Sequence, residues 1–232
     1  MKKKYYLIAV FVMVALLIAG GTVNAEPILT DYGQIIPYFG ISYNTFDLNS
    51  ENFTFALSEK FYDDEEDLDE FGDYYDINQS VSSGIGFHFG ALHWFDAEEY
   101  ENMALGAEFE RINTVEMSDQ DVRIQISNLG FLATGAYRLK DIDEEFPGYI
   151  DLLGGIGLYR ARFSMRDRIG NFNIQNSYWG PGLKIGLQGG YLFEEQEVAL
   201  GGRVGYRYAR PHSEGDLNYN GFEVGLQLSF GF

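Results

Sequence analysis

The chain has 232 residues and a formal net charge of −19, from 35 acidic residues against 16 lysines and arginines. A chain this acidic lacks the basic surface that nucleic-acid binding requires, so we expect no nucleic-acid partner. It contains no cysteine, which excludes a disulfide framework and thiolate chemistry.

The first 25 residues have the pattern of a secretory signal peptide. Lys2–Lys4 precede an almost uninterrupted apolar run, Leu7–Ala19, and the small residues of Val23–Ala25 follow. The apolar run is shorter than the roughly 20 residues that a membrane-spanning helix needs. We therefore expect cleavage after Ala25, which leaves residues 26–232 as one mature domain.

Apolar residues alternate with polar residues or glycine in eight segments of the mature chain, as expected for strands with two different faces. In the second segment, Ile85, Phe87 and Phe89 lie on one face, and His88 lies between glycines on the other. The eight segments span about 35–44, 84–95, 103–112, 122–139, 149–163, 178–193, 198–209 and 222–232.

The fourth segment, 122–139, changes parity along its length. Ile124 and Ile126 lie on one face, whereas Phe131 and the apolar residues around it lie on the other. A β-bulge near Ser127–Asn128 would bring them to the same face. We predict a bulge there and leave the register of this strand open.

The last segment shows the alternation most clearly. Every second residue from Phe222 to Phe232 is Phe, Val or Leu, and the residues between them are polar or glycine. Its length matches the roughly 9–11 residues that a tilted strand needs to cross a bilayer. A soluble barrel would carry apolar residues inside and polar residues outside. The second face here carries charges such as Lys184 and Arg203, and a dry core lined by such charges would be costly. The pattern therefore favours a membrane barrel with a polar lumen and an apolar exterior.

The connectors agree with that interpretation. Those after the first, third, fifth and seventh segments are on average longer than those between, as in barrels with long extracellular loops and short periplasmic turns. The longest, about 45–80, carries nine acidic residues within Asp63–Asp76. Backbone groups cannot remain unpaired in lipid, so the sheet must close. The predicted fold is an all-β, eight-stranded antiparallel up-and-down transmembrane barrel.

The signal peptide, the glycine- and aromatic-rich hairpins and the final strand together resemble small eight-stranded outer-membrane β-barrels of the OmpA/OmpX type. The resemblance covers the whole mature chain. It implies location in the bacterial outer membrane, a monomer, and recognition of the terminal aromatics by the barrel-assembly machinery. In this chain those aromatics are Phe230 and Phe232.

Six charged residues share the predicted inward parity. Because unpaired charges in a narrow lumen are costly, we expect a lumenal cluster, with Arg207 and Glu223 paired across the last hairpin. Its predicted members are Glu108, Glu110, Lys184, Arg203, Arg207 and Glu223.

Four arginines lie within nine positions after the fifth apolar segment: Arg160, Arg162, Arg166 and Arg168. Arg160 and Arg162 have the outward parity and lie just beyond the bilayer-spanning stretch. Arginine pairs bidentately with phosphate. These arginines are candidates for contacts with outer-leaflet lipid or lipopolysaccharide phosphates. The alternative is that they are only basic residues on an otherwise acidic loop surface.

We expect no catalytic site, cofactor or metal. Lipid A deacylases resemble this scaffold and use a His and a Ser separated by one residue, but His212 and Ser213 are adjacent and diverge if extended. His88 and His93 have opposite parity, which does not support metal ligation. The acidic run Asp63–Asp76 lacks the spacing of a calcium loop. Its interspersed aromatic residues suit an extracellular protein contact.

The sequence therefore favours a non-enzymatic outer-membrane barrel with a structural or surface-interaction role. The alternative is a small channel or conduit for ions or hydrophobic ligands, and a lipid-modifying enzyme comes third. The interior of an eight-stranded barrel is just filled by side chains, so a channel requires gaps. Inward glycines are the candidates for such gaps: Gly182, Gly186, Gly190, Gly201 and Gly205.

Overall fold

The computed structural model describes residues 28–30, 33–48, 81–114, 117–118, 122–140, 147–167, 173–193, 197–211 and 219–231. Within these residues, no helix is long and apolar enough to span a membrane. The described strands are β1 (Ile28–Thr30), β2 (Gly33–Leu48), β3 (Val81–Phe95), β4 (Met103–Thr114), β5 (Met117–Ser118), β6 (Val122–Lys140), β7 (Gly148–Asp167), β8 (Asn173–Phe193), β9 (Val198–Ala209) and β10 (Gly221–Phe230).

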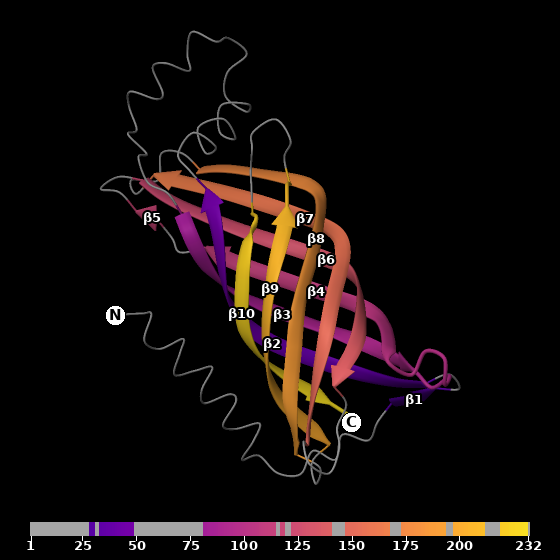
Figure 1. The fold of residues 1–232 in the computed structure, drawn as a ribbon. Coiled ribbons are helices and arrows are strands. Elements are labelled where there is room, and N and C mark those ends of the chain that lie inside the picture. The colour runs from indigo at the N-terminus through magenta and orange to yellow at the C-terminus, as the bar shows by residue number, and fades with distance from the viewer. Residues whose placement is uncertain are drawn as a thin grey trace.

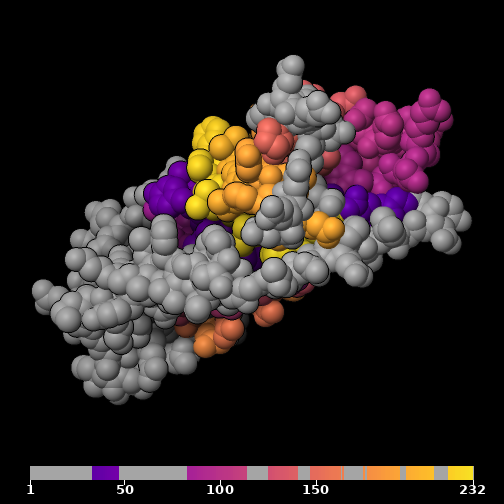
Figure 2. Space-filling model, turned by 90° about the horizontal axis from the view of Figure 1, so that it is seen from below, coloured from indigo at the N-terminus to yellow at the C-terminus, as the bar shows by residue number. Residues whose placement is uncertain are grey.

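The eight long strands of the described part form a closed antiparallel barrel (Figure 1). Neighbours along the chain pair with each other, and β2 pairs with β3 on one side and with β10 on the other. Figure 2 shows this closure, with indigo atoms of β2 beside the yellow atoms of β10. The short strands β1 and β5 pair only with β2 and β6. The predicted fold class is confirmed, and closure leaves no open edge among the long strands.

The faces of the barrel are arranged as the alternation predicts. Large apolar side chains point outward and stay exposed, whereas charged and amide side chains are buried inside. Leu226 on β10 is 62% exposed, while its neighbour Gln227 is 3% exposed. This inverted pattern suits an apolar solvent outside the barrel. One exception is Leu228, which has the outward parity of β10 but is only 7% exposed.

The long strands extend past the predicted segments at the end of the barrel opposite the short turns. β2 continues to Leu48 and β3 begins at Val81, so the first residues of the predicted 45–80 loop belong to a strand. β7 extends to Asp167 and β8 begins at Asn173, so both go beyond the predicted segments 149–163 and 178–193. Polar side chains do not end a strand once it leaves the bilayer, because the backbone ladder still pairs in water. Most of the acidic loop lies outside the described residues.

The bulge predicted near Ser127–Asn128 is wrong. β6 pairs with β7 without interruption there and with β4 as far as Ser127, and its irregularity against β7 lies at Arg138–Lys140. Ile126 is buried inside the barrel, in line with Asn128. The interior accepts apolar side chains near the long-connector end, so the change of parity needs no change of register.

Candidate functional site: the barrel interior

The interior is filled in three layers along the barrel axis. Nearest the short turns lies an apolar cluster contributed by β2, β3, β4, β6 and β7. All of its side chains are buried, so the interior at that end is apolar and closely packed. The cluster consists of Ile36, Tyr38, Leu92, Trp94, Ala104, Ala136 and Leu153.

The middle layer is a network of ion pairs centred on Lys184 of β8. Its Nζ lies 3.0 Å from Glu108 Oε1, 2.7 Å from Glu110 Oε2 and 2.7 Å from Glu223 Oε2. An ammonium group has three N–H donors, so each can serve one carboxylate. β4 supplies Glu108 and Glu110, and β10 supplies Glu223, so this one lysine connects three separate strands.

Arg203 of β9 completes the network from the neighbouring strand. Its Nη1 lies 2.7 Å from Glu108 Oε2, and its Nε lies 2.8 Å from Glu223 Oε1. Tyr38 donates a hydrogen bond of 2.9 Å to the same Glu108 oxygen. Glu108 and Glu223 therefore each lie within ion-pair distance of both cations, and pairing is the condition under which buried charges are tolerated.

Arg207 is held differently from the predicted pairing with Glu223. Its Nη1 donates to Asn44 Oδ1 at 2.9 Å and lies 3.5 Å from Glu110 Oε1, and its Nε donates to the Tyr219 carbonyl at 3.2 Å. Glu223 opposes Gly205, whereas Arg207 opposes Gly221. This register places Glu223 beside Lys184 and Arg203 instead.

Six predicted lumenal residues thus lie together, and their three carboxylates balance three cations. Sequence reasoning missed the neutral partners Tyr38 and Asn44, although both have the inward parity. It also missed a second ion pair nearer the short turns, in which Arg138 Nε lies 2.8 Å from Asp151 Oδ1. The guanidinium of Arg138 also lies 4.1 Å from the centre of the Trp94 ring.

The third layer closes the interior at the long-connector end. Tyr219 is fully buried, and its ring centre lies 5.6 Å from that of Phe46. Burial raises the pKa of the Tyr219 phenol far above its usual value, although the nearby Arg207 guanidinium acts in the opposite direction. Tyr159 and Asn128 are also fully buried in this region.

The inward glycines do not leave gaps, because tyrosine rings or neighbouring backbone atoms occupy the space beside them. A Cβ on Gly182 would lie 2.3 Å from the Tyr159 ring, and one on Gly190 would lie 2.8 Å from the Tyr149 ring. At Gly201 a Cβ would lie 2.2 Å from the Gly189 carbonyl oxygen. Glycine here permits close packing, which is opposite to the gaps that a conduit requires.

His88 is buried beside the ion network on β3. A Cβ on Gly40 of the neighbouring strand would lie 2.3 Å from its Nε2, so the imidazole also relies on a glycine for its space. His93 has the opposite parity, as predicted. Among the described residues, no group of three or more His, Asp or Glu side chains is placed to hold a metal ion.

Two of the four predicted phosphate-binding arginines have described side chains, both on the outer wall of β7. Arg160 donates from Nη2 to Ser177 Oγ at 3.2 Å and lies 5.6 Å from the Trp179 ring centre. Arg162 donates from Nη2 to Gln175 Oε1 at 2.5 Å. The backbone of Arg166 belongs to β7, and Arg168 lies outside the described residues.

The remaining predicted sites are described only in part. Phe230 ends β10 opposite Val198, whereas Phe232 lies outside the described residues. The His212–Glu214 segment and the acidic run Asp63–Asp76 also lie outside them, as does the signal peptide.

The fold is similar to that of several solved structures. Ail, the attachment invasion locus protein of Yersinia pestis, matches with a TM-score of 0.52 over 85% of this chain and 97% of that chain. This chain has the fold of the small outer-membrane β-barrels. A second Ail structure, in complex with the heparin analogue sucrose octasulfate, gives a TM-score of 0.50 over 84% and 97%.

Sequence identity to these two structures is 8% and 10%, so the likeness concerns the fold alone. Neisserial surface protein A also matches, with a TM-score of 0.46, 12% identity and coverage of 85% of this chain and 97% of that chain. No family model and no curated protein sequence matches the chain. The resemblance predicted from sequence is confirmed as a resemblance of architecture.

Proposed function

We propose that the chain is a non-enzymatic protein of the bacterial outer membrane with a structural or surface-interaction role. The observation that carries the proposal is the filled interior. An apolar cluster, a charge-balanced ion network and a buried aromatic layer follow one another along the barrel axis. Such an interior holds the barrel rigid and leaves its outer surface and loops to meet partners.

The alternative is a small channel or conduit, and it has a direct test. Purified protein reconstituted in planar bilayers should show no stable single-channel conductance. Arg203→Ala together with Glu108→Ala removes an ion pair from the middle layer without leaving either partner charged and alone. If the wild-type protein conducts and this double variant conducts more, the interior is a pathway and the structural role is overturned.

The arginines of the outer wall support a contact with lipid phosphate. Arg111 on β4 opposes Leu129 on β6, which opposes Arg160 on β7, which in turn opposes Trp179 on β8. The two arginines therefore belong to one row across four strands, beyond the apolar band. Anionic headgroups of the outer leaflet, including lipopolysaccharide phosphates, are ligands of matching charge.

Replacing Arg160 and Arg162 by alanine should weaken lipopolysaccharide binding by at least about tenfold, because charge-assisted hydrogen bonds to phosphate would be lost. Binding to labelled lipopolysaccharide in detergent measures the effect. Lys140→Ala is the control, since Lys140 is also exposed but lies at the opposite, short-turn end of β6. Equal losses of lipopolysaccharide binding in the double variant and in the control would indicate that binding depends only on net charge, which would contradict the phosphate contact.

Assembly supplies a further proposed partner. The terminal apolar face, which ends at Phe232, suits recognition by the barrel-assembly machinery. Deleting Phe232 should slow membrane insertion and leave precursor in the periplasm, measured by pulse-chase fractionation. Unchanged insertion kinetics would remove this role from the residue.

A further inference from the structure

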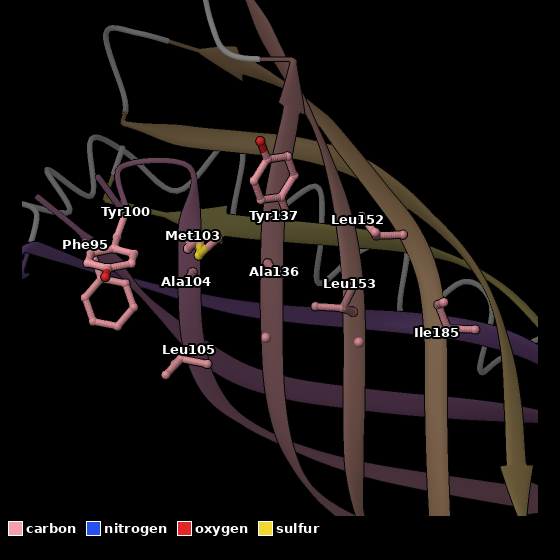
Figure 3. A pocket seen from close by; sticks show the side chains of 12 residues that line it. Phe95, Tyr100, Met103, Ala104, Leu105, Ala136, Tyr137, Leu152, Leu153 and Ile185 are labelled. Atoms are coloured by element: carbon pink, nitrogen blue, oxygen red, sulfur yellow. The ribbon is translucent and has the colours of Figure 1, made fainter. Parts of the chain in front are cut away.

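The outer wall of the barrel is hollowed near the short turns by an apolar groove of about 660 Å³. Figure 3 shows Phe95, Tyr100 and Met103 at one side and Leu152 and Ile185 at the other. The volume falls within the roughly 300–1,000 Å³ of typical ligand sites. The remaining lining residues are Ala104, Leu105, Gly135, Ala136, Tyr137, Leu153 and Gly154.

Two facing glycines create the groove. Gly135 of β6 opposes Gly154 of β7, and both have the outward parity of their strands. A Cβ on Gly154 would meet nothing within 4 Å, and one on Gly135 would meet its nearest atom at 3.6 Å. These glycines differ from the inward Gly182 and Gly190, where a tyrosine ring occupies the space beside the glycine. The two outward glycines therefore leave a depression in an otherwise continuous apolar outer wall.

The base of the groove is apolar as well. Ala104, Ala136 and Leu153 line it and also belong to the apolar cluster inside the barrel. The sheet is continuous here, since Ala104 pairs with Ala136 and Ala136 with Leu153, so the base of the groove is the outer surface of the sheet. Water has no polar partner there, so an apolar occupant is favoured.

The groove opens beside an acidic turn. Phe95, Tyr100 and Met103 flank or belong to the connector between β3 and β4, which also carries Glu98 and Glu99. Both glutamates are exposed. A headgroup next to this turn would meet negative charge, which favours an ammonium group over an anionic headgroup.

We propose that the groove binds an acyl chain of a phospholipid whose headgroup carries a primary ammonium, such as phosphatidylethanolamine. The inference rests on the proposed membrane location, because the groove belongs to the lipid-facing band. The chain lies against Gly135 and Gly154, and the ammonium lies near the acidic turn. A second pocket of about 450 Å³ shares Leu152 and Ile185 with the groove, so the apolar surface continues around the wall.

Gly154→Leu tests the acyl-chain site, because the new side chain enters the open space without meeting backbone. The matched control is Gly202→Leu. Gly202 also faces outward, its nearest atom to a Cβ is 3.7 Å away, and it lines neither pocket. Full-length protein is folded into vesicles of phosphatidylethanolamine and phosphatidylglycerol and extracted in mild detergent. Native mass spectrometry then identifies the lipids that stay bound.

Wild-type protein and Gly202→Leu should each retain one phosphatidylethanolamine, and Gly154→Leu should retain about tenfold less. Equal retention by the two variants would overturn the site. Loss of a dimer rather than a lipid in Gly154→Leu would also overturn it and identify a second copy as the occupant. Failure of the wild-type protein to insert into the vesicles would instead contradict the proposed membrane function.

The headgroup is tested separately by Glu98→Gln with Glu99→Gln. This pair should retain a lipid but lose the preference for phosphatidylethanolamine over phosphatidylglycerol. Retention of that preference would overturn the ammonium part of the proposal. The chain-binding part would then be judged by Gly154→Leu alone.

Discussion

Single buried charges in this barrel are held by several partners at once. Lys184 meets three glutamates, and Glu223 meets both Lys184 and Arg203. Removing one member leaves the others buried with an unbalanced charge. Stability at the residue scale therefore depends on which charges are in contact. Glu223 contacts Lys184 and Arg203, and not Arg207 as predicted.

Glu223→Ala should destabilise the barrel by about 3–5 kcal/mol, because two buried cations lose a carboxylate. Adding Arg203→Ala should recover part of that loss, since contacting residues are non-additive. Equilibrium unfolding in lipid vesicles measures the double-mutant cycle. Arg207→Ala is the control partner: its cycle with Glu223→Ala should be closer to additive. Strict additivity for Arg203 would contradict the pair.

Gly182→Ala should destabilise the barrel by about 1–3 kcal/mol, the usual cost of overpacking, because the added methyl meets the Tyr159 ring. Gly154→Ala adds the same methyl where nothing lies within 4 Å, so its effect should be small. Unfolding free energies of the two variants, compared side by side, check this. Equal losses of stability in the two variants would mean that contact with the Tyr159 ring does not determine the cost at Gly182.

At the scale of the strand, parity determines which solvent each side chain meets. β10 keeps its outward face apolar, with Phe222, Val224 and Leu226 all strongly exposed, and buries Glu223 and Gln227 between them. β6 shows the limit of this rule. Ile126 points inward with Leu132 because the interior has apolar layers, so an apolar residue does not by itself mark the outer face.

Leu226→Arg should destabilise the barrel by about 2–4 kcal/mol in a bilayer if the side chain lies near the midplane. The physical reason is the cost of a charge in hydrocarbon, and the same variant should lose much less stability in a detergent micelle that admits water. Unfolding titrations in the two environments provide the comparison. A negligible cost in the bilayer would contradict the lipid-facing assignment of β10.

At the scale of the whole molecule, closure orients every connector. β2, β4, β7 and β9 finish at one end of the barrel, and β3, β6, β8 and β10 finish at the other. The turns nearest the apolar interior cluster face the periplasm in the proposed membrane orientation. The filled interior then separates the two ends, so contact with the outside passes through loops and outer wall.

Protease added to intact cells should cut within residues 49–80 and leave the barrel in the membrane, because this connector follows the first long strand. Immunoblotting against tags at each end of the mature chain follows the fragments. Cleavage only after permeabilisation would reverse the assigned orientation.

The sequence alone determined the existence of the eight long strands, most of their faces and the class of barrel, because period-two alternation is a local property that needs no knowledge of neighbours. It also placed six charges inside, since parity follows from each strand separately. Only the tertiary structure decided which charges pair, because register between strands sets Glu223 beside Arg203 rather than Arg207. The same is true of the glycines: whether each is filled by a ring, as Gly182 is, or left open, as Gly154 is, depends on a strand that is distant in sequence.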